Sequence, residues 1–108
     1  INAIMEYQKE SHYAPTDVTV LTQIAHCYRH LGDYSKAKKF LENTLSILPM
    51  YAEAHYELAR VYANDNDLVN ARKHMDIVQT IWENADPEYP PARSAKRFYE
   101  SIITRRPS

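Results

Sequence analysis

The fold is decided by a stretch of sequence that the chain repeats once. Residues 21–49 read LTQIAHCYRHLGDYSKAKKFLENTLSILP, and 34 positions later residues 55–83 read HYELARVYANDNDLVNARKHMDIVQTIWE. This shift superimposes like residues in four pairs, which are Ala25 with Ala59, Tyr28 with Tyr62, Asp33 with Asp67, and Ala37 with Ala71. A fixed period of this length indicates that the chain stacks copies of one structural unit.

Each copy reads as two helices joined by a tight turn. In the first copy, apolar residues recur three and four positions apart in two runs, Leu21, Ile24, Ala25, Tyr28 and Leu31, then Ala37, Phe40, Leu41, Leu45 and Leu48. Between the runs, Gly32 can adopt a positive φ at a helix end, and Asn66 takes its place in the second copy. Asp33 and Asp67 follow as N-caps. The alanines predict close helix crossings.

The same spacing extends the array in both directions. Ala3 and Tyr7 align with Ala37 and Leu41, which predicts a lone helix near the start of the chain. At the other end, Ala95, Phe98, Tyr99, Ile102 and Ile103 form one apolar face, which predicts a capping helix. We therefore expect one domain over 1–108, consisting of a half repeat 1–15, repeats 18–51 and 52–85, and a capping helix 90–105.

The repeats resemble the tetratricopeptide repeat family, whose unit places a bulky residue, leucine, a small residue and tyrosine on one helix, then alanine and an aromatic residue before proline. The first copy fits this frame with Leu21, Ile24, Ala25, Tyr28, Ala37, Leu41 and Pro49, and the second with His55, Leu58, Ala59, Tyr62, Ala71 and Met75. Glu83 replaces the second proline. The resemblance implies an all-α fold, a right-handed α-α superhelix of helical hairpins.

Composition excludes several classes of function. The chain has 13 basic and 14 acidic residues, so bulk charge does not favour a polyanion ligand. Its one glycine cannot build a phosphate-binding loop, and no apolar run approaches the ~18 residues of a membrane span. The single cysteine, Cys27, forms no intrachain disulfide, and a free thiol argues mildly against secretion, which favours the cytoplasm. We expect no cofactor.

Catalysis and metal binding have little support. His26 and His30 are one helical turn apart and flank Cys27, which suggests a shared ion, but two neighbouring ligands do not make a zinc site, which needs three or four. His55 is the best distant ligand, although its position normally packs against a neighbouring helix. We read Cys27 as a packed thiol. No nucleophile and base spacing stands out, so the sequence predicts neither an enzyme nor a metal protein.

Nucleic-acid binding is a second alternative. Residues 92–108 carry five basic residues and one acidic residue, a net charge of +4, whereas residues 1–91 sum to -5. A basic helix beside Phe98 and Tyr99 is compatible with a phosphate backbone, but the two aromatic residues fit better as the buried face of the cap. We expect no nucleic-acid partner.

Recognition of another protein is the function that the resemblance implies. Such stacks hold a partner peptide or helix in a concave groove lined by the first helix of each repeat. First-helix residues that the core pattern leaves unassigned form the candidate site: Thr22, His26, Arg29, His30, Tyr56, Arg60 and Asn64. The 34-residue shift places Thr22 beside Tyr56 and His26 beside Arg60, which suits an acidic or C-terminal peptide. The alternative is a structural segment that joins flanking repeats of a longer array, or a module that self-associates through Ile1, Ile4 and Met5.

Overall fold

The fold is an all-α stack of helical hairpins, as the sequence predicts. A computed structural model describes residues 17–85 and 88–104, and within these it contains helices and turns but no strand. The helices are α2 (Val18–His30), α3 (Tyr34–Ile47), α4 (Ala52–Asn64), α5 (Leu68–Ile81) and α6 (Pro90–Ile103). The predicted half repeat 1–15, with the self-association residues Ile1, Ile4 and Met5, lies outside the described residues.

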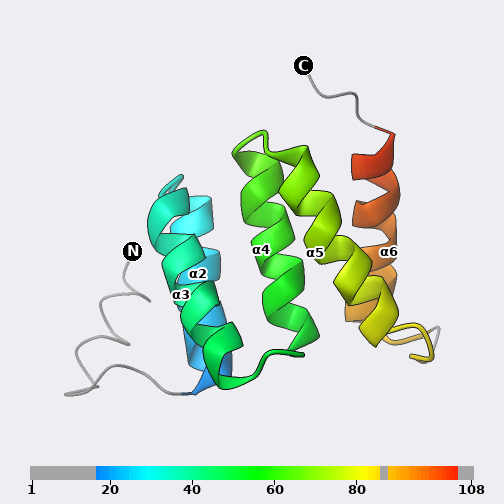
Figure 1. The fold of residues 1–108 in the computed structure, drawn as a ribbon, viewed down its shortest axis with the longest axis horizontal. Helices are drawn as coiled ribbons and strands as arrows, with labels where there is room; N and C mark the ends of the chain where they lie inside the picture. The colour runs from blue at the N-terminus through cyan, green and yellow to red at the C-terminus, as the bar shows by residue number, and fades with distance from the viewer. Residues whose placement is uncertain (1–16, 86–87, 105–108) are drawn as a thin grey trace.

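The helices follow one another across the molecule in chain order. Figure 1 shows α2 and α3 at one side, α4 and α5 in the middle, and α6 at the far side. Helix α2 packs against α3, and α4 packs against α5, which gives two hairpins, while α6 packs against α5 and α4. The predicted capping helix is therefore confirmed, with its start at Pro90 and its last helical residue at Ile103. The last helix of the second hairpin ends at Ile81, inside the predicted repeat 52–85.

Both hairpin turns have the chemistry that the sequence predicts. Gly32 has a φ of 80° and Asn66 a φ of 60°, so both residues lie in the left-handed region. The Asp33 carboxylate accepts a hydrogen bond of 3.2 Å from the amide of Lys36. Asp67 does the same for Asn70 at 3.1 Å. Each aspartate therefore caps the second helix of its hairpin, which stabilises that helix by about 1 kcal/mol.

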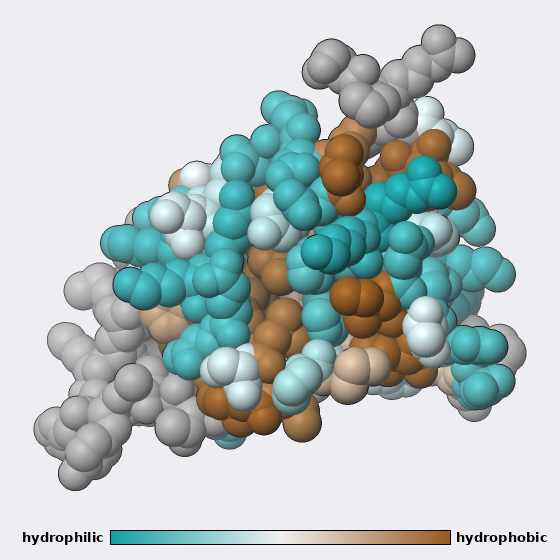
Figure 2. Space-filling view, viewed as in Figure 1, coloured by the Kyte–Doolittle hydropathy of each residue, from teal (hydrophilic) through white to brown (hydrophobic). Residues whose placement is uncertain are grey.

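The predicted alanine crossings are confirmed. Ala25, Ala37, Ala59 and Ala71 are each fully buried: the first two lie in a core cluster that reaches into α4, and the last two in a second cluster that reaches into α6. Figure 2 shows apolar side chains in the seam between α3 and α4, with hydrophilic side chains over α3. A side chain larger than alanine would separate the paired helices, so these positions set the spacing inside each hairpin.

Four apolar residues do not lie where the sequence places them. Leu31, Leu48 and Ile103 are 50%, 45% and 45% exposed, because each lies at the end of a helix, beyond the turns that its neighbour covers. Cys27 is partly exposed rather than packed in the core. The Trp82 ring meets the Tyr89 ring edge-on at 5.7 Å beside the start of α6.

A histidine pair links α4, α5 and the loop between the hairpins. His55 is buried, as predicted, and its Nε2 donates to the carbonyl of Pro49 at 2.8 Å. The other ring nitrogen of His55 must then accept, so the 3.1 Å contact between the two Nδ1 atoms is a hydrogen bond from His74. The His74 ring stacks on Tyr62 at 5.6 Å. Burial, followed by the charges of His55 and Lys73, lowers the pKa of His74 to about 4.

This lowered pKa predicts that the fold weakens in mild acid. The pKa of His74 is about 6.5 in the unfolded chain and about 4 in the folded chain. Between these two pH values the unfolded state therefore binds more protons than the folded state. We expect His74 to account for a loss of about 1 kcal/mol of unfolding free energy between about pH 7 and pH 5.5, a value reduced for its partial exposure. Urea unfolding of the wild type and of His74→Gln at both pH values measures it. Equal losses in the two proteins would contradict the prediction.

Candidate functional site

The first helices of the repeats lie on the inner side of the stack. Helix α4 contacts both α2 and α6, whereas α3 and α5, within the part of the chain that the structure describes, do not contact each other. The stack therefore curves with α2, α4 and α6 on its concave side. We call the surface that these three helices form the inner face.

A polar cluster bridges α2 and α4 on the inner face. We define this inner-face cluster as six residues: His26, Arg29, His30, Glu57, Arg60 and Asn64. Glu57 lies at its centre, and its two carboxylate oxygens lie 2.6 Å from Nδ1 of His26 and 2.5 Å from Nε of Arg29. Arg29 also donates from Nη1 to Oδ1 of Asn64 at 3.0 Å. Side chains from two repeats are thus held in one network.

The centre of the cluster is buried and its edge is open. The side chains of Arg29 and Glu57 are only 8% and 7% exposed, whereas those of His26 and Arg60 are 39% and 31% exposed. Among the described residues, no buried side-chain nitrogen or oxygen lacks a hydrogen-bond partner. The buried Arg29–Glu57 ion pair therefore holds the cluster in place. The groups that an incoming molecule can reach are the two histidines and Arg60.

The cluster carries an excess of positive charge. Glu57 is shared between Arg29 and the more distant Arg60, whose Nη1 lies 3.9 Å from Oε1. Two guanidinium groups thus face one carboxylate, before any histidine is protonated. The nearby charges of Arg29 and His26 lower the pKa of His30. This region of the inner face attracts an anionic group.

An aromatic surface adjoins the cluster. Tyr56 stands next to Glu57 on α4, and its ring meets Phe98 of α6 edge-on at 5.8 Å. The guanidinium carbon of Arg60 lies 5.3 Å from the centre of the Tyr56 ring. A cation held over an aromatic ring keeps its orientation while its donors stay available. The inner face therefore offers an apolar contact and a positive charge side by side.

The structure brings together five of the seven candidate site residues that the sequence predicts. His26, Arg29, His30, Arg60 and Asn64 belong to the inner-face cluster, and Tyr56 lies at its border. The hydroxyl of Thr22 donates to the carbonyl of Val18 within α2 at 2.7 Å. His26 contacts Glu57 directly, whereas the sequence predicts Arg60 as its neighbour.

The assumption that Arg29 is spare surface is wrong, and Glu57 is the residue that the candidate list missed. Both side chains are buried because they satisfy each other between the two hairpins. A signal was present in the sequence: Arg29 continues the four-residue spacing of Leu21 and Ala25, and Glu57 lies three residues after Ala54 and four before Val61. Periodicity thus places both charges on core faces, where an ion is stable only when it is paired.

A metal site is not formed by the histidines. The Nε2 atoms of His26 and His30 lie 3.1 Å apart, but Nη2 of Arg29 lies 3.3 Å from the same atom of His30. A guanidinium cation therefore stands where a third ligand would be needed. In residues 17–85 and 88–104, no group of three or more histidine, cysteine, aspartate or glutamate side chains could hold a metal ion.

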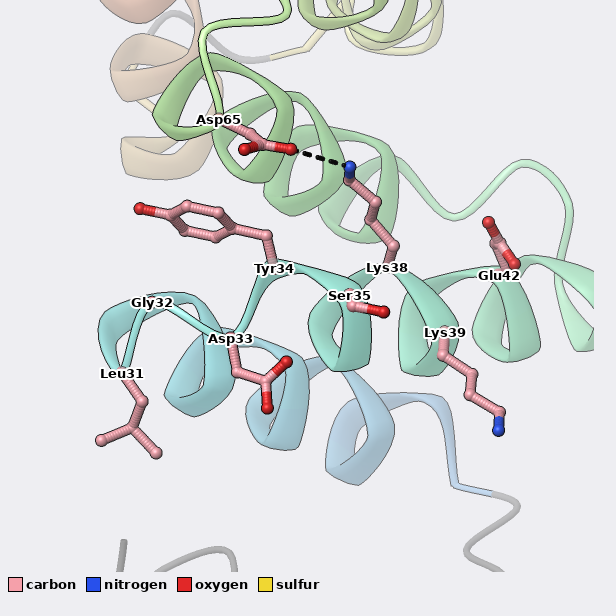
Figure 3. Close-up of a pocket in the computed structure, with 9 residues that line it drawn as sticks. All are labelled: Leu31, Gly32, Asp33, Tyr34, Ser35, Lys38, Lys39, Glu42 and Asp65. Carbon is pink, nitrogen blue, oxygen red and sulfur yellow. Dashed lines mark hydrogen bonds and ion pairs between the residues drawn. The ribbon is translucent and has the colours of Figure 1, made fainter.

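A second hollow lies at the hairpin turns and makes a weaker candidate. Figure 3 shows Lys38 of α3 reaching Asp65 at the end of α4, with Tyr34 nearby. The Nζ to Oδ2 distance is 3.2 Å, and Lys38 also lies 4.8 Å from the centre of the Tyr62 ring. The lining mixes two lysines with three carboxylates, so it favours neither charge. We assign this hollow a structural part, because Lys38 ties the first repeat to the second.

The comparison with known proteins agrees with the geometry. A family model described as tetratricopeptide repeat matches residues 28–97, which spans both described hairpins from Tyr28 onwards and reaches into α6. No curated protein matches the chain. Within the described residues, none of the helices is both long and apolar enough to cross a membrane. The match covers more than half of the sequence, and the chain therefore belongs to the tetratricopeptide repeat family.

Proposed function

We propose that this chain is a noncatalytic interaction module that binds a segment of a partner protein in the groove of its inner face. The tetratricopeptide repeat suggests a protein-protein interaction module, and proteins of this family are generally noncatalytic scaffolds. The observation that carries the finer proposal is the position of the inner-face cluster, since its accessible groups adjoin the Tyr56 and Phe98 rings on the concave side.

The chemistry of the inner face favours an acidic segment. Arg60 supplies a forked donor for a carboxylate, and His26 and His30 add further nitrogen donors within the same network. Tyr56 offers an apolar surface for a neighbouring side chain of the partner. A side-chain carboxylate and a C-terminal carboxylate both suit this arrangement. The partner we propose is therefore a peptide or helix with an acidic group beside an apolar one.

The burial of Arg29 and Glu57 supports binding by keeping the site rigid. Their ion pair fixes α2 against α4, so the two histidines and Arg60 are held near one another before a partner arrives. Groups that are already positioned lose little conformational entropy on binding. The aromatic and arginine residues of the face are also the types that contribute most to binding at protein interfaces.

Removing Tyr56 and Arg60 tests this proposal. The probe is a peptide selected from a display library for binding to the wild-type chain, and its affinity is measured by fluorescence anisotropy. We expect Tyr56→Ala combined with Arg60→Ala to weaken binding at least about 30-fold, because two central contacts are lost. The single variant Arg60→Glu should weaken binding of the same peptide without removing an aromatic contact from the core.

The control is Lys39→Ala, which removes a positive charge from the exposed surface of α3. It should leave the affinity within about twofold, and circular dichroism should show the same helical signal in all four proteins. Unchanged affinity in the Tyr56 and Arg60 double variant, with its helical signal intact, would refute the inner face as the binding surface. An equal loss in Lys39→Ala would show that net charge alone governs binding.

A further inference from the structure

His26 and His30 form a coupled pair whose contacts restrict where protons can lie. Their Nε2 atoms are 3.1 Å apart, so one nitrogen must donate and the other must accept. Nδ1 of His26 lies 2.6 Å from the Glu57 carboxylate, which can only accept, and it therefore carries a proton. Because that nitrogen donates to Glu57, the 3.4 Å contact between it and Arg29 Nη2 is not a second hydrogen bond.

The proton between the two Nε2 atoms belongs either to His30 or to His26. If it belongs to His30, whether that ring is neutral or charged, Arg29 faces an N–H group at 3.3 Å that cannot accept its proton. If it belongs to His26, that ring is charged and donates to Glu57 and to His30, and Nε2 of His30 accepts from His26 and Arg29 together. The arrangement with His26 charged satisfies the contacts that Nε2 of His30 makes, and it leaves the Nδ1–H of the exposed His30 ring as a donor.

The surrounding charges oppose the additional proton. The described charged groups that face the pair are Arg29 on its own helix and, on α4, Glu57 and Arg60. Glu57 favours the proton, but its carboxylate is also paired with Arg29. With His26 charged, the cluster holds three positive groups against one negative group. Hydrogen-bond geometry therefore favours the charged pair and electrostatics disfavours it.

An anionic group on the inner face would remove this conflict. We propose that the His26 and His30 pair takes up a proton when a carboxylate of the partner binds beside Arg60, so that acidic segments bind more tightly as the pH falls from about 8 to about 6. This inference rests on the proposed function, since it concerns the same inner face. The carboxylate of the partner stays ionised over this range, because its own pKa is near 4. The histidines are thus the groups that change charge.

Calorimetry with two peptides tests the inference. The first probe is a short peptide of alternating glutamate and leucine, acetylated and amidated at its ends, and the second has glutamine for each glutamate and a free C-terminal carboxylate. Titration at pH 7 in two buffers of different ionisation enthalpy counts the protons taken up. We expect about half a proton per complex at pH 7 with the peptide whose carboxylate binds, and an affinity about 3- to 10-fold higher at pH 6 than at pH 8. The two peptides distinguish side-chain from terminal carboxylates.

In the variant His26→Gln with His30→Gln, the binding of the same peptide that remains should show neither the proton uptake nor the pH dependence of the wild type. Nuclear magnetic resonance of the wild-type imidazoles gives a second measurement that needs no variant. The pKa of His26 or His30 should rise when the peptide is added, while His55 and His74, held in their own contacts, serve as internal controls.

Binding without proton uptake, or with one affinity at both pH values, would overturn the inference while leaving the inner face as a binding surface. Failure of both peptides to bind between pH 6 and pH 8 would overturn it as well. The proposed function is then judged separately, by the display-selected peptide and the Tyr56 and Arg60 variants.

Discussion

Replacing Glu57 with alanine is expected to lower the free energy of unfolding by about 3–5 kcal/mol, because it leaves the guanidinium of Arg29 buried without its partner. The Arg29 side chain is only 8% exposed, and Glu57 faces it at 2.5 Å. Such a loss is a large share of the ~5–15 kcal/mol that stabilises a small domain. Urea unfolding followed by circular dichroism measures it.

Two further proteins make this experiment specific. Removing both charges, with Arg29→Met and Glu57→Leu together, should restore most of the lost stability, because an apolar pair of similar volume needs no counter-charge. Glu42→Ala, on the exposed surface of α3, should change the unfolding free energy by less than about 0.5 kcal/mol. If the double variant is as unstable as Glu57→Ala, the burial of an unpaired charge is not the cause.

The repeat pattern was sufficient to predict the hairpins, their turns and their crossings. Gly32 and Asn66 both have positive φ, and Asp33 and Asp67 both cap helices, because these functions depend on residues that are adjacent in sequence. The helix ends were less predictable. Leu31 continues the apolar spacing of α2, yet it is exposed, since periodicity does not reveal where the neighbouring helix stops covering it.

The inner-face cluster was predictable only in part. Sequence spacing identifies the residues on the first helices, but aligning repeats at equal positions assumes that equivalent residues meet. In the structure, His26 contacts Glu57, 31 positions later, rather than Arg60 at the full period. Which side chains of adjacent first helices meet therefore depends on tertiary packing.

Buried charge was the second source of error. Arg29 and Glu57 look like surface residues by type, since each would be strongly unfavourable in a core alone. Only together, with Asn64 as a further acceptor, are they stable between the hairpins. Their positions in the apolar pattern were informative, but residue type dominated the interpretation. Charged residues at core-facing positions of successive repeats are therefore expected to form ion pairs with each other.

The geometry of the inner face depends on the close helix crossings at the alanines. They set the distance between paired helices, and through it which faces of α2 and α4 are turned inward. Ala37 and Ala71 are fully buried in the two core clusters, so a leucine at either position must displace a helix. We expect Ala37→Leu and Ala71→Leu each to lower the unfolding free energy by about 1–3 kcal/mol. Ala92 offers a matched control, because it lies at the start of α6 and lines an open hollow beside Trp82.

The most direct test is therefore the unfolding free energy of three single variants, Ala37→Leu, Ala71→Leu and Ala92→Leu, each compared with the wild type. A stack built on repeated close crossings predicts substantial and similar losses at the two repeat positions and less than about 0.5 kcal/mol at Ala92. Equal effects at all three positions, or none at Ala37 and Ala71, would contradict the assigned faces and with them the inner face.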